Sequence, residues 1–213
     1  MEKDKMNSFS LALGLFDYIN PIFYSITSIT VLLNMKALMN KPVLIIYIVG
    51  MLLSLIFGFT IPTVKCLVGL GKFEFKMPVN LVFYVNLGIL LSGICLSSHV
   101  LKLKAITLLF ILICVIALLG FIVYKTKKFN TAAVLTGAVG YILIYCSLIS
   151  LAISTNKTLS IVMYAIAICL FIFLCFVGIK ANLKNPKVHW VIEISNVVCQ
   201  MLVAISTILL YKH

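Results

Sequence analysis

The residues best suited to chemistry lie near the C-terminal end, inside a long apolar stretch. His189, Glu193, Asn196 and Gln200 are spaced four, three and four residues apart, which places them on one face of a helix. An ionised side chain at the centre of a bilayer costs at least about 2.5–3.5 kcal/mol. If this stretch crosses a membrane, the face must therefore point toward the protein interior. Glu193 could then bind a cation, carry a proton or hydrogen-bond a polar substrate; the alternative is a neutral Glu193 held by neighbouring helices.

A second polar row lies near the N-terminus. Asp17, Asn20, Tyr24 and Ser28 follow the same helical periodicity, and Pro21 interrupts them. Proline has no N–H, and its ring crowds the carbonyl four residues earlier, which here belongs to Asp17. Transporters bind ions and polar substrates at broken helices of this kind. The alternative is that Asp17 simply lies at the membrane interface in the first turn of its helix.

The elements that must position these residues are apolar stretches of about 20 residues each. The 213-residue chain is 63% hydrophobic and only 10% charged, whereas soluble proteins carry about 25% charged residues. About 20 apolar residues in a helix match the thickness of a bilayer. We therefore predict one all-α, polytopic membrane domain over residues 1–213, a bundle of about seven transmembrane helices. The predicted helices cover approximately residues 10–33, 42–61, 79–99, 105–124, 131–154, 158–179 and 188–211.

All 17 basic residues are lysines, and the net charge is +12. Because the lysines fall at the ends of the apolar stretches, we interpret them as anchors at anionic lipid headgroups and expect no nucleic-acid partner. Eleven lysines, including Lys65 in the joint Thr63–Pro78, fall on the N-terminal side of the predicted topology and six on the other. The excess predicts a cytoplasmic N-terminus and an external C-terminus. We also expect the protein to lie in the plasma membrane.

Small residues recur along the stretch 131–154. Ala132, Thr136 and Gly140 are four residues apart, a spacing that lets two helix backbones approach closely in lipid. Gly88 and Ser92 form a weaker version. These residues predict either ordinary packing within the bundle or a homo-oligomer interface through Ala132, Thr136 and Gly140.

Motifs for catalysis and for metal or phosphate binding are missing from the sequence. It has no GxSxG, HExxH or GxxxxGK[ST], and its cysteines and histidines lack zinc spacing. We therefore expect no metal, no cofactor and no catalytic residue, and an enzyme is the less favoured reading.

A few short segments are similar to a known family. The tail VCQMLVAIS (Val198–Ser206), the Lys41–Pro42 pair and the Gly88–Ser92 segment resemble the lysoplasmalogenase-like membrane family. The resemblance implies a membrane enzyme acting on lipid. However, the aspartates that would be catalytic in that family fall on Leu96 and Cys175 in this chain, so the resemblance does not extend to them.

The polar rows favour a small-solute or ion transporter or channel. Glu193, Asn196 and Gln200 would form the binding site, with Asp17 and Asn20 opposite and His189 at the membrane edge. Its ligand would be a small polar solute or a cation. Two alternatives stay open: a non-catalytic membrane partner, such as a sensor, immunity or assembly subunit, and a lipid-modifying enzyme.

Overall fold

The computed structural model describes residues 10–71, 79–103, 107, 110, 111, 113–115, 117, 118, 120, 121, 129–180 and 186–212. This part of the chain is helical, with no β-strand among the described residues, so the predicted all-α class is confirmed. Its helices are α1 (Leu11–Asp17), α2 (Ile19–Met35), α3 (Lys41–Gly69), α4 (Val79–Val100), α6 (Phe129–Ser154), α7 (Thr158–Lys180) and α8 (Pro186–Tyr211).

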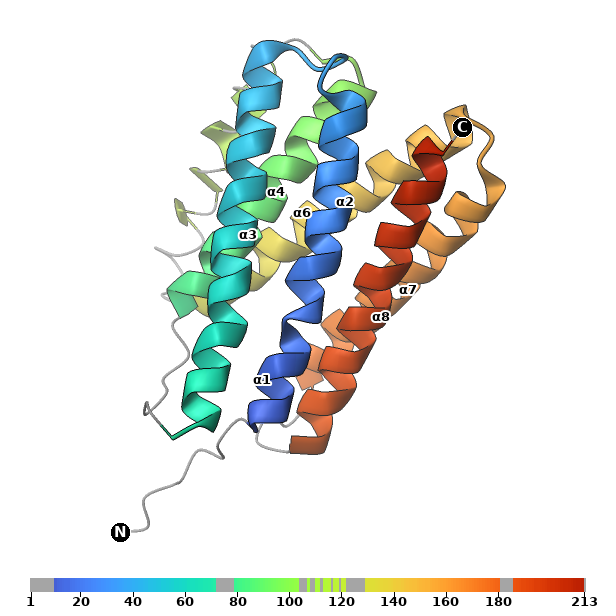
Figure 1. Cartoon of the computed structure of the whole chain (residues 1–213). Helices are drawn as coiled ribbons and strands as arrows, with labels where there is room; N and C mark the ends of the chain where they lie inside the picture. The colour runs from blue at the N-terminus through green and yellow to red at the C-terminus, as the bar shows by residue number, and fades with distance from the viewer. Residues whose placement is uncertain are drawn as a thin grey trace.

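Five of the described helices, α3, α4, α6, α7 and α8, are long and apolar enough to cross a membrane. This supports an integral membrane protein. α1 and α2 lie end to end along the bundle (Figure 1) and together cover the first predicted span. Half of the stretch 105–124 lies outside the described residues. The number of about seven spans therefore stays a prediction.

The first predicted span is broken at Tyr18, between α1 and α2. Ser10 caps α1 by accepting a hydrogen bond from the Leu13 N–H at 3.2 Å. The break lies one turn before Pro21, because proline cannot donate to the Asp17 carbonyl. Asp17 thus ends one helix, and Asn20 lies in the first turn of the next.

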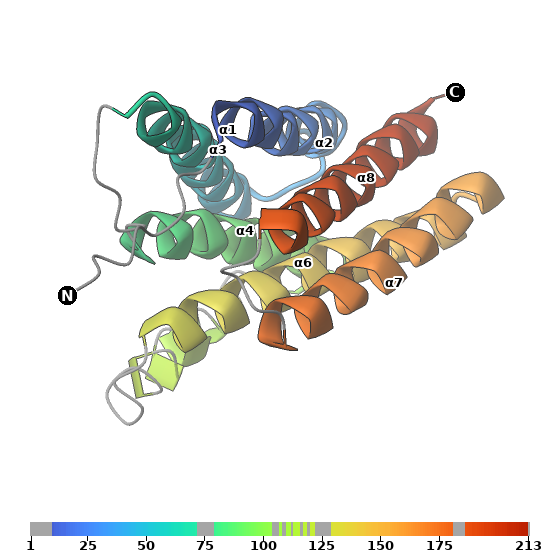
Figure 2. The ribbon, with the colours of Figure 1, turned by 90° about the horizontal axis from the view of Figure 1, so that it is seen from below.

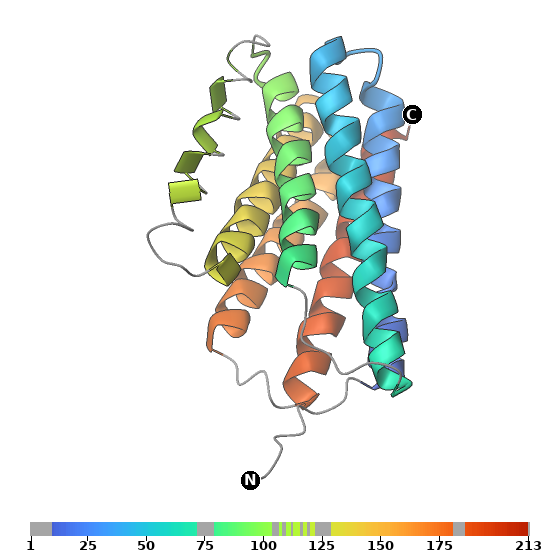
Figure 3. The same ribbon diagram turned by 90° about the vertical axis from the view of Figure 1, so that its left-hand side faces the viewer.

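The helices pack in three tiers (Figure 2). α1, α2 and α3 form one outer tier, α6 and α7 form the other, and α4 and α8 lie between them. Along the chain, α3 packs against α4, α4 against α6, and α7 against α8, while α2 packs against α8. α4 therefore lies between α3 and α6, as Figure 3 also shows.

Glycines allow the backbone of α4 to come into contact with the backbones of both of its neighbours, α3 and α6. A Cβ added at Gly50 of α3 would lie 2.8 Å from the Gly88 carbonyl oxygen of α4. On the other side, a Cβ at Gly140 of α6 would lie 2.7 Å from the Leu90 nitrogen. Close approach of this kind supplies packing energy that lipid, itself apolar, does not provide.

The stripe of small residues on α6 faces α4 within the same chain. Ala132 is 0% and Thr136 1% exposed, and Gly140 is also buried. The prediction of bundle packing is thus the one that holds. The structure does not support the alternative, a homo-oligomer through Ala132, Thr136 and Gly140, because α4 of the same chain already covers that face.

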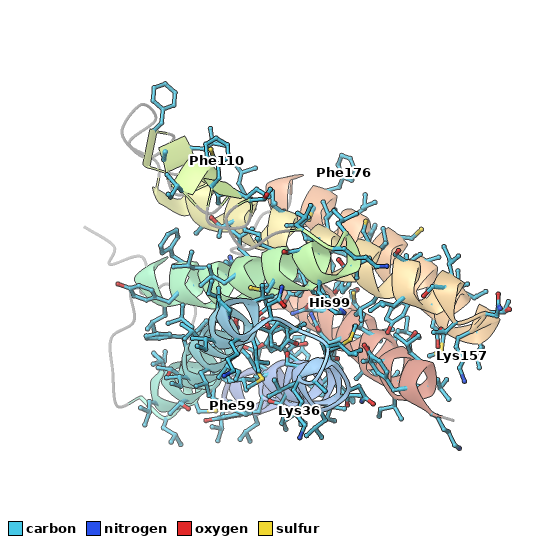
Figure 4. The ribbon with its side chains drawn as sticks, turned by 90° about the horizontal axis from the view of Figure 1, so that it is seen from above. Lys36, Phe59, His99, Phe110, Lys157 and Phe176 are labelled. Atoms are coloured by element: carbon cyan, nitrogen blue, oxygen red, sulfur yellow. The ribbon has the colours of Figure 1, made fainter. Side chains whose placement is uncertain are left out.

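Large apolar side chains point outward over most of the bundle. Phe110 and Phe176 project away from the helices (Figure 4), and they are 67% and 61% exposed. On α8, Val191 and Ile194 are about half exposed, on the face opposite the polar row. Such a surface suits acyl chains, whereas water would penalise it.

α3 is longer than the predicted span 42–61, because it continues through Pro62 to Gly69. Pro62 stays inside the helix and removes only the N–H that would have bonded to the Gly58 carbonyl. The extra two turns place Lys65 inside the bundle, where it is 5% exposed. The interpretation of Lys65 as a headgroup anchor was therefore wrong.

Candidate functional site

Two carboxylates meet one lysine in the bundle interior. The Lys65 Nζ lies 2.6 Å from Asp17 Oδ2 and 2.9 Å from Glu193 Oε1. The Asn20 Nδ2 donates to Asp17 Oδ1 at 3.1 Å and to Glu193 Oε2 at 3.3 Å. All four carboxylate oxygens are thus bonded, and Lys65 and Asn20 each bridge both acids. We call these four residues the ion cluster.

The side chains of the ion cluster are largely withdrawn from the surface. Lys65, Asp17 and Glu193 retain 6%, 10% and 12% of their side-chain exposure. Desolvating charges is costly unless they are paired and hydrogen-bonded. The closed ring of bonds meets that requirement, and it explains how two acids and a lysine persist inside an apolar bundle.

Four different helices contribute to the ion cluster: Asp17 from α1, Asn20 from α2, Lys65 from α3 and Glu193 from α8. Gly14 makes the α1–α3 contact close enough, because a Cβ there would lie 2.9 Å from the backbone nitrogen of Cys66. Gly14 is one turn before Asp17, and Cys66 follows Lys65. This backbone contact therefore sets the distance across which Lys65 reaches Asp17.

The ion cluster lies close to one end of the bundle. Asp17 is six residues from the start of α1, Glu193 seven from the start of α8, and Lys65 four from the end of α3. At 1.5 Å per residue these separations correspond to about 6–10 Å. The three helix ends lie at the same end of the molecule (Figure 1), so the ion cluster lies one to two turns in from that end.

A cavity of about 240 Å³ extends from the ion cluster between the helices. Both predicted polar rows reach it: Asp17, Asn20 and Tyr24 from the first, and Asn196 and Gln200 from the second. The rest of its wall is formed by Pro21, Ser54, Gly58, Ile61, Val85, Asn86, Ile89 and Tyr141. Since about 10–15 Å³ is enough for one water molecule, the cavity has room for several waters or a small solute.

Several oxygens around the cavity lack a hydrogen-bond partner in the described part of the chain. The Tyr24 hydroxyl and the Asn20 Oδ1 are both buried and unpartnered there. Pro21 and Pro62 withhold N–H donors from the carbonyls of Asp17 and Gly58. Pro21 lies against Gly58, at 3.5 Å from where a Gly58 Cβ would be. Buried acceptors without partners are rare and costly. A hydrogen-bond donor or a cation bound in the cavity would satisfy them.

The amides of the cavity wall differ in how they are held. Asn86 donates to the Ala133 carbonyl at 2.8 Å and packs against Gly137 of α6. It therefore joins α4 to α6 as well as lining the cavity. Gln200 is 3% exposed and lies deeper along α8. Gln200 also borders a separate space of about 10 Å³, lined by Ser28, Tyr47 and Ser92 among others, which is enough for one water molecule.

The predicted site residues thus fall into three groups. Asp17, Asn20 and Glu193 meet in the ion cluster. Asn196 and Gln200 line the adjoining cavity. His189 is half-buried on the same face of α8 but is not among the residues that line the cavity.

Sequence reasoning missed Lys65, the central residue of the ion cluster. The missing signal was the inward register of α3, in which Val43, Tyr47, Gly50 and Ser54 are buried at helical spacing. Continued by fours and threes through Gly58 and Ile61, the same register reaches Lys65. The predicted helix ended at Ile61, just before Pro62, so its inward register was not extended to Lys65.

The fold and the site define an α-helical integral membrane protein with a buried lysine–dicarboxylate cluster beside a polar cavity. Comparison of the chain with protein-family models, curated proteins and solved structures gave no match.

Proposed function

We propose that the protein is a transporter or channel for a small polar solute or cation, with Asp17, Asn20, Asn196 and Gln200 contacting the solute and Glu193 holding the charge balance with Lys65. The observation that carries this proposal is the cavity, which both polar rows reach and which adjoins the ion cluster. A bundle built only for stability would fill this volume with apolar side chains, since closer packing favours folding.

The test is solute entry into proteoliposomes, followed by stopped-flow light scattering. Vesicles containing the protein should swell faster than protein-free vesicles in at least one of urea, glycerol or ethylammonium chloride. Glu193→Gln should slow that swelling at least about tenfold, the effect of about 1.4 kcal/mol on a barrier. Ile194→Leu, one residue further along α8 on the lipid-facing side, should leave the rate unchanged.

A second variant keeps the test decisive if Glu193→Gln folds poorly. Asn196→Leu leaves the bonds that join Lys65 and Asn20 to the two acids intact, and it places an apolar side chain in the cavity. Slow swelling in Asn196→Leu would support the cavity as the path. Swelling at the wild-type rate in both Glu193→Gln and Asn196→Leu would remove the site from the mechanism.

A non-catalytic membrane partner is the second candidate, and one observation favours it: all four carboxylate oxygens are already bonded within the chain. A fully paired ion cluster can serve purely to fix the arrangement of four helices. Swelling that never exceeds the protein-free rate, for any of the three solutes, would favour this candidate.

We further propose that the protein lies in the plasma membrane with the N-terminus in the cytoplasm and the C-terminus outside. With Lys65 removed from the count, ten lysines still oppose six, so the positive-inside bias persists. A C-terminal alkaline phosphatase fusion is expected to be active and a C-terminal green fluorescent protein fusion dark. The opposite pair of results would reverse the topology.

A further inference from the structure

The charges of the ion cluster do not balance. Asp17 and Glu193 bring two formal negative charges, and Lys65, which forms both ion pairs seen among the described residues, brings one positive charge. A net charge in a low-dielectric interior is costly. The ion cluster with both acids ionised is therefore one positive charge short.

An additional positive charge would bind in the cavity, because the Asp17 carboxylate is part of its wall. Two oxygens in the cavity wall lack a partner within the described chain. One is Asn20 Oδ1, on the amide that donates to Asp17, and the other is the hydroxyl of Tyr24, seven residues after Asp17 in the chain. Tyr24 is 8% exposed, so water outside the protein does not satisfy its hydroxyl. A carboxylate with unpartnered oxygens beside it selects a ligand that is positive and donates hydrogen bonds.

The volume of the cavity and the residues in its wall restrict the class of ligand further. A volume of about 240 Å³ is far larger than a bare metal ion requires. Tyr24 and Tyr141 also line the space, and aromatic rings attract organic cations. Lys65 already shows how an ammonium group sits between these acids, since its Nζ bonds to both.

We propose that the cavity binds a small protonated amine, with its ammonium group donating to Asp17 and to the oxygens of Tyr24 and Asn20. This inference rests on the proposed function and specifies its substrate class. The amine supplies the positive charge that the ion cluster lacks. Transport of neutral polar solutes is then secondary to transport of the cation.

The test is calorimetric titration of the detergent-purified protein with ethylammonium chloride in sodium phosphate buffer. Potassium chloride at the same ionic strength, neutral ethylene glycol and sodium acetate are titrated in parallel. Ethylammonium should give saturable heat, and the other three should not. Preferential binding of potassium would assign the site to alkali cations, and binding of ethylene glycol equal to that of ethylammonium would overturn the requirement for charge.

Two variants test the assigned contacts. Asp17→Asn and Tyr24→Phe should each weaken ethylammonium binding at least about tenfold, as expected for a lost hydrogen bond to a charged group. Tyr24→Phe removes a hydroxyl that has no partner among the described residues, so the fold should be preserved. Tyr211→Phe is the matched control, because its hydroxyl is also buried and unpartnered there but does not line the cavity.

The outcomes separate this inference from the proposed function. Ethylammonium binding without any swelling of vesicles would leave the ligand class intact and remove transport. Swelling in urea or glycerol, with no binding of ethylammonium, would leave transport intact and remove the ligand class. Equal affinities in Tyr24→Phe and Tyr211→Phe would overturn the assigned contacts.

Discussion

Lys65→Met is expected to cost the protein about 3–5 kcal/mol of unfolding free energy, because it leaves two acids in the bundle without their shared cation. Lys65 is bonded to both Asp17 and Glu193, so no single replacement bond can compensate. The measurement is denaturant-induced unfolding in detergent micelles. Lys36→Met is the matched control, since Lys36 is exposed just after the end of α2 and its charge is already solvated.

A triple variant distinguishes charge imbalance from lost packing. Lys65→Met combined with Asp17→Asn and Glu193→Gln removes all three charges and keeps the side-chain sizes similar. Neutral replacements of buried ion pairs are often close to neutral in stability, so most of the loss should be recovered. If Lys65→Met proved as stable as Lys36→Met, the ion cluster would not be holding the four helices together.

Gly140→Ala is expected to destabilise the protein by about 1–3 kcal/mol, the usual cost of overpacking. The new Cβ would lie 2.7 Å from the Leu90 nitrogen and 2.8 Å from the Leu90 Cα. Both are backbone atoms, so relief requires α4 and α6 to separate. The overpacking outweighs the helix propensity of alanine, which by itself favours alanine over glycine by about 1 kcal/mol.

Gly120→Ala is the matched control for Gly140→Ala, because nothing lies within 4 Å of a Cβ built at Gly120. We expect it to leave stability unchanged or slightly raised. The two variants are compared by thermal unfolding in the same detergent. Equal melting temperatures would mean that the α4–α6 contact tolerates a methyl group and is looser than the distances indicate.

The sequence predicted the fold class and the inward faces because both depend on local periodicity. Long apolar stretches need lipid, and polar residues at helical spacing need an interior. Those two rules placed Asp17, Asn20, Glu193, Asn196 and Gln200 toward the centre of the bundle, where the structure has them. They could not show which helices meet, because α1 and α8 lie at opposite ends of the chain and only packing joins them.

Lys65 shows the limit of the same rules. A lysine near the end of an apolar stretch satisfies the pattern of a headgroup anchor, and nothing local distinguishes an anchor from a buried counter-ion. The difference arises from Asp17 and Glu193, which are 48 and 128 residues away in the chain. Only their combined charge makes the interior the better place for its ammonium group.

The glycine contacts on both sides of α4 also determine which parts of the molecule can move. Backbone contacts at Gly50–Gly88 and Gly140–Leu90 hold α3, α4 and α6 together as a single block, because their backbones are too close for the helices to slide past one another. The Gly14–Cys66 contact joins α1 to the same block. Any alternation between the two sides of the membrane would then have to come from movement of α2, α7 and α8 against that block. Asn20 and Glu193 lie on the moving helices, whereas Lys65 and Asp17 stay with the block. Each cycle of opening would therefore have to break and remake the Lys65–Glu193 ion pair.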